Sequence, residues 1–148
     1  MNKWTKLAYQ LGARPKPKGL ETTPEGVFTV WFIDSAGISS AKATKHHEDD
    51  IRYFHNGTHV RAFDLEYFYL TKEEAEQEQL HNLYGDEEEL AQQLENPEEL
   101  QWLALEQLAQ HGGKLEKQFD YVCTIGEYRE LGNTPAEAVF NTLLEVYK

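Results

Sequence analysis

RYFHNGTHVR, residues 52–61, is the stretch of sequence that decides the fold. Asn56 and Gly57 lie at its centre, between two short runs that contain aromatic and β-branched residues. Asn-Gly readily takes positive φ at both central positions of a type I′ turn, and the twist of that turn matches a β-hairpin. Apolar residues then alternate through residues 63–69. We therefore expect an antiparallel hairpin whose second strand continues to Tyr69.

A further strand precedes this hairpin. Gly26 opens the run VFTVWFI, residues 27–33, which is apolar at nearly every position. A run that is apolar on both faces is typical of a strand covered on both sides, so we expect it to be central in the sheet. Residues 34–45 are small and polar and indicate either a loop or a weak edge strand, and residues 46–50 indicate a loop.

The middle of the chain, residues 71–111, has the signals of three helices. TKEE, residues 71–74, is a capping box, in which a threonine hydroxyl and a glutamate satisfy free groups at the helix start. We expect this first helix to run to about residue 84, where a glycine follows. Asp86 can cap a second helix, and Asn96 with the proline after it can begin a third.

Residues 1–19 indicate an N-terminal helix and a basic linker. Asn2 can cap the helix. Apolar residues follow at i, i+3, i+4 and i+7, which is one helical stripe: Trp4, Leu7, Ala8 and Leu11. RPKPK, residues 14–18, is then expected to be a stiff spacer, because proline favours an extended backbone.

The last third of the chain repeats strand and helix signals. Residues 119–125 alternate between apolar and other residues and predict a strand, with a short partner strand at residues 128–131. TPAE, residues 134–137, is a second capping box that begins the last helix. The phrase LGNTPAEAV, residues 131–139, resembles the strand-to-helix junction of HicB-type antitoxin domains. That resemblance implies a strand, a cap and a helix here, and we carry no further fold or activity over from it.

Strands and helices come in blocks rather than in strict alternation, which predicts an α+β fold with a mostly antiparallel sheet. We expect the C-terminal strands to return to the sheet of residues 27–70, with the acidic helical segment and the C-terminal helix packed on it. The length of 148 residues and the absence of internal repeats indicate one domain, residues 1–148.

The charge of the chain is concentrated in one block. The formal net charge is −12, and residues 48–111 carry seventeen Asp/Glu against three Lys/Arg. Residues 1–47 carry seven Lys/Arg against three Asp/Glu and are mildly basic. Contacts with phosphate need lysine and arginine, so we expect no direct binding of nucleic acid through the acidic block.

The composition also indicates a compartment. There is one cysteine, so no disulfide framework is present, which fits a reducing environment. The N-terminal residues lack the apolar stretch of a signal peptide, and no apolar run is long enough for a membrane span. We expect a cytoplasmic protein that does not bind membranes.

The acidic helices supply the candidate partner-binding residues. They are Glu73, Glu74, Glu78, Asp86, Glu87, Glu88, Glu89, Glu95, Glu98 and Glu99. A rigid array of carboxylates can imitate DNA phosphates and compete for the lysines and arginines of a nucleic-acid-binding enzyme. We expect a non-enzymatic binding or inhibitory protein that engages a basic protein surface. Its sharpest form is a DNA mimic of the phage-encoded, anti-defence type, and the alternative is a solvated surface that maintains solubility.

Two further hypotheses belong to other classes. The first is a structural or regulatory homodimer that uses the aromatic sheet or the C-terminal helix. The second is a metal-dependent enzyme, because six potential ligands fall within fourteen residues: His46, His47, Asp49, Asp50, His55 and His59. Their spacing fits no established motif, and neither phosphate-binding loops nor CxxC pairs occur, so we expect no metal, cofactor or catalytic residue. Cys123 is expected to be a buried core thiol.

Overall fold

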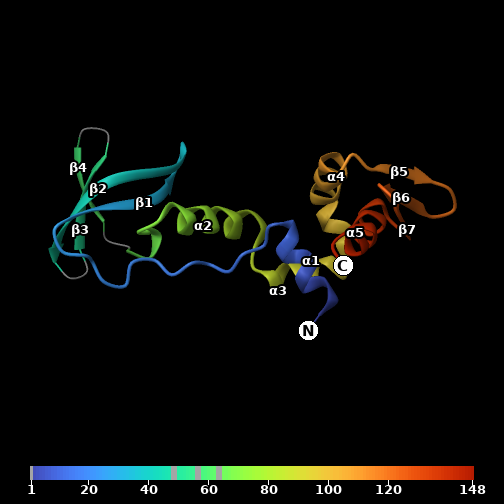
Figure 1. Ribbon diagram of the computed structural model, residues 1–148, viewed down its shortest axis with the longest axis horizontal. Helices are drawn as coiled ribbons and strands as arrows, with labels where there is room; N and C mark the ends of the chain where they lie inside the picture. Colours follow the sequence, from blue (N-terminus) through green and yellow to red (C-terminus); the bar gives the residue numbers. More distant parts are fainter. Residues whose placement is uncertain (1, 48–49, 56–57, 63–64) are drawn as a thin grey trace. The chain divides into compact units, whose positions relative to one another are not determined.

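Figure 1 shows the computed structural model of the chain, which describes residues 2–47, 50–55, 58–62 and 65–148. Helices and antiparallel sheets make up the structure, which confirms the predicted α+β class. The chain divides into two compact units: the terminal unit, Met1–Ala13 with Tyr84–Lys148, and the central unit, Arg14–Leu83. Each unit has a sheet and a buried core of its own.

The central unit contains a four-stranded antiparallel sheet whose strands follow their order in the chain. They are β1 (Val27–Asp34), β2 (Gly37–His47), β3 (Asp50–His55) and β4 (Thr58–Ala62). His55 of β3 pairs with Thr58 of β4, which confirms the predicted hairpin with two residues between its strands. The predicted type I′ turn at those two residues, 56 and 57, lies outside the described residues.

β1 is an edge strand, so the prediction that it is central is wrong. β2 pairs with one side of β1 along its whole length. On the other side the amides of Trp31 and Tyr69 each donate to the carbonyl of the other, at 2.8 and 2.9 Å. Val30 and Phe32 are buried, whereas Trp31 between them is half-exposed. Apolar composition did not reveal the position of β1 in the sheet, because that position depends on which strands pair.

Residues 37–47 form the long inner strand β2, although a loop or a weak edge strand was expected at residues 34–45. Its small side chains, such as the buried Ala43, leave room for the larger residues of β1 and β3. Pairing on both sides therefore holds a segment whose own strand propensity is modest. The loop expected at residues 46–50 is wrong at three of its positions, because β2 reaches His47 and β3 begins at Asp50. Residues 48 and 49 lie outside the described residues.

β4 ends at Ala62, so its predicted continuation to Tyr69 is wrong. A 3-10 turn, η1 (Leu65–Tyr67), follows, and Tyr69 then returns to β1. The ring of Phe68 lies 5.5 Å from that of Phe32, beside the core of the central unit. The alternating aromatic residues of this segment therefore close the edge and one face of the sheet instead of extending one strand.

α2 (Lys72–Tyr84) begins at the predicted capping box. The Thr71 hydroxyl accepts a hydrogen bond from the Glu74 amide at 3.3 Å and donates one to the Glu74 carboxylate at 2.8 Å. These two bonds satisfy a free amide of the first turn, which is why the helix starts at this point.

The basic linker, residues 14–18, which we predicted to be a stiff spacer, is hydrogen-bonded to α2 at two positions. The Pro15 carbonyl accepts a hydrogen bond from Gln77 Nε2 at 2.8 Å. The Arg14 carbonyl accepts one from His81 Nδ1, also at 2.8 Å. Figure 1 shows this extended segment running beside α2. Its prolines keep the backbone extended, and its carbonyls remain available to polar side chains of the helix.

The terminal unit contains a separate three-stranded antiparallel sheet in the order β5–β6–β7. The strands are β5 (Lys114–Lys117), β6 (Tyr121–Ile125) and β7 (Tyr128–Gly132). The prediction that these strands join the sheet of residues 27–70 is therefore wrong. They pair with one another, and α5 (Pro135–Val146) packs on β6 and β7, so this sheet buries a face without the other sheet.

β5 escaped prediction because Leu115 is its one apolar residue. Phe119, which we expected to begin the next strand, lies in the turn between β5 and β6 and is fully exposed. The amide of Gln118 donates to the carbonyl of Asp120 at 2.9 Å, which closes that turn. The predicted strand therefore began two residues before β6, because Phe119 in the turn fits the alternation of apolar residues.

The other helices of this unit are α1 (Lys3–Leu11), α3 (Glu87–Leu94) and α4 (Gln101–Gln110), with a 3-10 turn, η2 (Pro97–Leu100), before α4. Three predicted caps form. Asn2 accepts from the amide of Trp4 at 2.9 Å, Asp86 from that of Glu89 at 2.8 Å, and Thr134 from that of Glu137 at 3.1 Å. The side chain of Asn96 makes no such bond, and the chain there continues through η2.

The core of the terminal unit lies where α5 meets β6, β7 and the other helices. Phe140 and Leu143 of α5 are fully buried there. Gly132 ends β7 so close to α5 that a Cβ atom on it would lie 2.3 Å from the backbone nitrogen of Ala138. The missing side chain therefore sets how closely strand and helix approach.

We expect Gly132→Ala to destabilise the protein by about 1–3 kcal/mol, because the added methyl group meets backbone atoms that must shift. Chemical denaturation followed by circular dichroism measures this. Arg129→Ala, at an exposed position on the same strand, is the matched control and should change stability by less than about 0.5 kcal/mol. Equal stability of Gly132→Ala and the wild-type protein would contradict this packing.

Cys123 is buried in the same core, as predicted, and burial raises the pKa of its thiol. A raised pKa keeps the thiol protonated at about pH 8, where an exposed cysteine is partly thiolate. We expect a disulfide-exchange reagent to leave Cys123 unlabelled in the native protein and to label it once the chain is unfolded in urea. Rapid labelling of the folded protein would show that this part of the core is open.

The prediction of a single domain concerns cooperative folding and stays a prediction. The two segments of the terminal unit are separated in sequence by the whole central unit. Unfolding the central unit would leave a long flexible loop to be closed, which disfavours the terminal unit entropically. We therefore expect amide signals of β2 and β6 to disappear over the same range of urea in nuclear magnetic resonance spectra. Two separate midpoints would establish two independent domains.

Candidate partner-binding surface

The ten predicted acidic residues do not all lie in one unit. Glu73, Glu74 and Glu78 belong to α2 in the central unit. Glu78 is buried, with 6% of its surface exposed, and Glu74 is half-buried and bonded to Thr71. Glu73 is therefore the one exposed member of this group of three.

Glu78 has a structural environment that the charge pattern did not reveal. It lies beside Tyr69, whose side chain is fully buried. Burial, and secondarily the Glu78 carboxylate, raises the pKa of Tyr69 well above its ordinary value. A buried carboxylate next to a buried phenol is part of the interior of the central unit, so Glu78 is not available to a partner.

The other seven predicted residues lie in the terminal unit, along α3 and η2. Exposed carboxylates are Glu88, Glu89, Glu95, Glu98 and Glu99, and Asp86 and Glu87 are half-buried at the start of α3. Residues 84–113 contain eight Asp/Glu and no Lys or Arg. None of these carboxylates forms an ion pair with a Lys or Arg of the described residues.

Part of this charge has a local structural cause. Asp86 caps α3, and Glu87, Glu88 and Glu89 fill its first turn. Carboxylates at that end of a helix interact favourably with the partial positive charge of its free amides. Glu98 occupies the corresponding first turn of η2 with its neighbour Glu99. Helix starts therefore explain the positions of Asp86, Glu87, Glu88, Glu89, Glu98 and Glu99. No Lys or Arg among the described residues forms an ion pair with them.

α4 adds two exposed apolar residues to this acidic segment. Trp102 is 47% exposed and Leu105 is 57% exposed. Their spacing of i, i+3 places them on one side of the helix. Glu98 and Glu106 lie four residues before and after Trp102, so carboxylates flank the indole. Sequence reasoning missed this pair because it followed the inward stripe of α4 and did not ask what its outer face carried.

The indole of Trp102 is held in position by the neighbouring ring of Tyr84. The indole stacks on Tyr84 with ring centroids 6.2 Å apart and planes 14° from parallel. Tyr84 in turn contacts the backbone at Gly12, where a Cβ atom would lie 2.6 Å from the ring. Burial, and secondarily the Glu106 carboxylate, raises the pKa of Tyr84. The indole is thus presented in a defined position.

The metal hypothesis is not tested by the structure. The side chains of His46, His47, Asp49, Asp50, His55 and His59 lie outside the described residues. Among the side chains that are described, no group of three or more His, Cys, Asp or Glu is arranged to hold a metal ion. Within the same described part of the chain, no helix has the length and apolar character needed to cross a membrane.

Comparison with other proteins does not add to this picture. No protein-family model matches the chain, no curated protein is significantly similar to it in sequence, and no solved structure is significantly similar to its fold.

Proposed function

We propose that the protein is a non-enzymatic binding protein and that its partner binds at the acidic-aromatic surface. This surface is defined as Glu98, Glu99, Trp102, Leu105 and Glu106, on η2 and α4. The observation that carries the proposal is the exposure of Trp102 and Leu105 within a segment that has eight carboxylates and no Lys or Arg. A surface that only maintains solubility has no need of an exposed tryptophan beside an exposed leucine.

The chemistry of the surface defines the partner. Tryptophan is enriched among the few residues that supply most of the energy of protein interfaces. The stack on Tyr84 holds Trp102 in place, so little side-chain entropy is lost on binding. Flanking carboxylates attract lysines and arginines and speed the encounter. The partner is therefore a protein with an apolar cleft that is rimmed by basic residues.

The exposed side chain of Trp102 also bears on the hypothesis that the protein is a DNA mimic. A DNA mimic needs carboxylates at phosphate-like spacing, and α3 with η2 carries several exposed carboxylates. Trp102 and Leu105 add an apolar anchor that DNA phosphates do not have. In its sharpest form, we propose that the protein inhibits a nucleic-acid-binding enzyme, as a phage-encoded anti-defence protein would. It would bind the basic residues that lie beside an apolar cleft of that enzyme.

A homodimer through this surface is disfavoured by its charge. Two copies would bring Glu98, Glu99 and Glu106 of each chain toward one another with no compensating cation. Like charges that face each other across an interface cost several kcal/mol, and a cost of this size is enough to exclude a wrong partner. We expect no homodimer through this surface, and a dimer that persists at low salt and is lost in Trp102→Ala would contradict the proposal.

We expect Trp102→Ala to weaken partner binding at least tenfold, which corresponds to about 1.4 kcal/mol. The partner is first captured from host lysate on the immobilised wild-type protein, and its dissociation constant is then measured with purified proteins. Leu131→Ala, at an exposed apolar position in the same unit, is the matched control and should leave binding unchanged. Equal affinity of the wild-type protein and Trp102→Ala would exclude this surface.

The carboxylates are tested by charge removal without a change in shape. We expect the triple variant Glu98→Gln, Glu99→Gln, Glu106→Gln to bind more weakly and to lose most of the salt dependence that the wild-type protein shows. Glu116→Gln with Glu127→Gln removes carboxylates at exposed positions of the β5–β7 region and serves as the control. Binding that is insensitive to salt in all of these proteins would show that the acidic groups serve solubility alone.

A further inference from the structure

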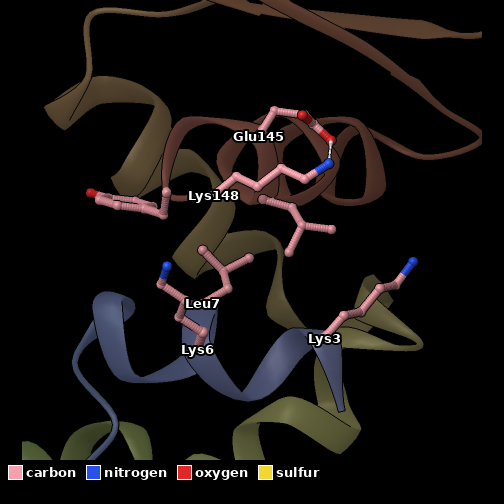
Figure 2. A pocket seen from close by; sticks show the side chains of 7 residues that line it. Lys3, Lys6, Leu7, Glu145 and Lys148 are labelled. Atoms are coloured by element: carbon pink, nitrogen blue, oxygen red, sulfur yellow. Dashed lines mark ion pairs between the residues drawn. The ribbon is translucent and has the colours of Figure 1, made fainter. Parts of the chain in front are cut away.

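A pocket of about 350 Å3 lies between α1 and the end of α5, within the terminal unit (Figure 2). Lys3, Lys6 and Leu7 line it on the side of α1. These residues are spaced i, i+3 and i+4, which places them on one face of the helix. Figure 2 shows Lys6 and Leu7 projecting from α1 toward α5, with Lys3 at the other end of the same face.

The α5 side of the pocket repeats this combination of apolar and basic residues. Leu144, Tyr147 and Lys148 line it and have the same spacing of i, i+3 and i+4. Glu145 is the one carboxylate in the lining, and it pairs with Lys148 at 3.6 Å. The side chains around the pocket are therefore three lysines, one glutamate and three apolar or aromatic residues.

The wall formed by Tyr147 is held in place by α4. The hydroxyl of Tyr147 lies 2.9 Å from Nε2 of His111. Nδ1 of the same ring lies 2.8 Å from the carbonyl oxygen of Gln107, which can only accept, so Nδ1 carries the proton and donates. Nε2 of the neutral ring then accepts the proton of the Tyr147 hydroxyl. These two hydrogen bonds fix the orientation of the phenol ring before any ligand arrives.

The charge around this pocket is opposite to that of the unit that contains it. The terminal unit carries six Lys/Arg against fourteen Asp/Glu, a net charge of −8. Half of those six cations line the pocket. Residues 1–13 contain no Asp or Glu. Neither Lys3 nor Lys6 forms an ion pair with a carboxylate of the described residues, and Lys3 rests 5.1 Å from the ring centre of Trp4.

We propose that this pocket binds a small amphipathic carboxylate. Its apolar body would lie against Leu144 and the ring of Tyr147, beside the largely buried Leu7, and its carboxylate would meet the ammonium groups of Lys3 and Lys6. Lysine carries its charge on a flexible four-carbon stem, so both ammonium groups can approach one head group. A volume of about 350 Å3 is at the lower end of small-molecule pockets, which favours a short chain or a single ring.

The chemistry of the ligand is tested with four compounds added to the isotopically labelled full chain, followed by nuclear magnetic resonance. Octanoate has both the head group and the tail, and we expect it to shift the amide signals of α1 and of the end of α5. Octanol lacks the charge, acetate lacks the tail, and octylammonium has the opposite charge. We expect each of these three to bind at least tenfold more weakly than octanoate.

The site is tested with a pair of variants that have the same net charge. Lys3→Gln with Lys6→Gln should weaken octanoate binding at least tenfold. Lys114→Gln with Lys117→Gln changes two exposed lysines of β5 in the same unit and should leave the affinity unchanged. All four positions are exposed, and equal unfolding midpoints in circular dichroism confirm that every variant folds.

Three results would overturn the proposal. Octanol that binds as tightly as octanoate would show an apolar groove without selectivity for an anion. Equal octanoate affinity in the two variants would show that Lys3 and Lys6 take no part. Octanoate shifts confined to residues outside α1 and the end of α5 would place the binding elsewhere. The experiment does not use the acidic-aromatic surface, so its outcome is independent of the proposed partner-binding function.

Discussion

The close approach of β7 to α5 is the constraint on which the terminal unit depends. Gly132 allows the strand to end against the backbone of Ala138, and Phe140 and Leu143 then fill the space between helix and sheet. Because close-packed interiors tolerate little change in volume, one glycine fixes the distance between the two layers. The three C-terminal strands can therefore form an independent sheet, with α5 supplying the cover that a second sheet would otherwise have to provide.

This arrangement also positions both surfaces to which we assign a role. α4 packs beside α5 with Leu103 and Ala104 buried, so the opposite side of α4 must carry Trp102 and Leu105 outward. The end of α5 places Leu144 and Tyr147 across from Leu7 of α1. The outer face of α4 is not needed for the core and is free to carry other chemistry. The pocket instead uses residues of the core or beside it, because Leu7 is buried and Leu144 and Tyr147 pack against the same core.

The charge of the chain has more than one cause in the structure. Carboxylates at the start of α3 stabilise a helix end, and Glu78 belongs to the interior of the central unit. Counting charges along the sequence could not separate these roles, because each depends on where a helix begins and what lies beside it. The informative feature was the exposed apolar pair within the acidic segment, which a count of carboxylates overlooks.

The sequence by itself determined the local elements, because each depends on neighbouring residues. Asn-Gly indicated the hairpin of β3 and β4, and the side chains of Asn2, Thr71, Asp86 and Thr134 marked helix starts that the structure confirms. Only the tertiary structure decided that β1 lies at an edge, that the polar β2 is an inner strand, and that β5 exists at all. Strand pairing joins residues distant in sequence, so composition and periodicity cannot reveal it. For the same reason, the stack of Trp102 on Tyr84 and the facing of Lys6 and Leu7 toward Leu144 become visible only once the helices are packed.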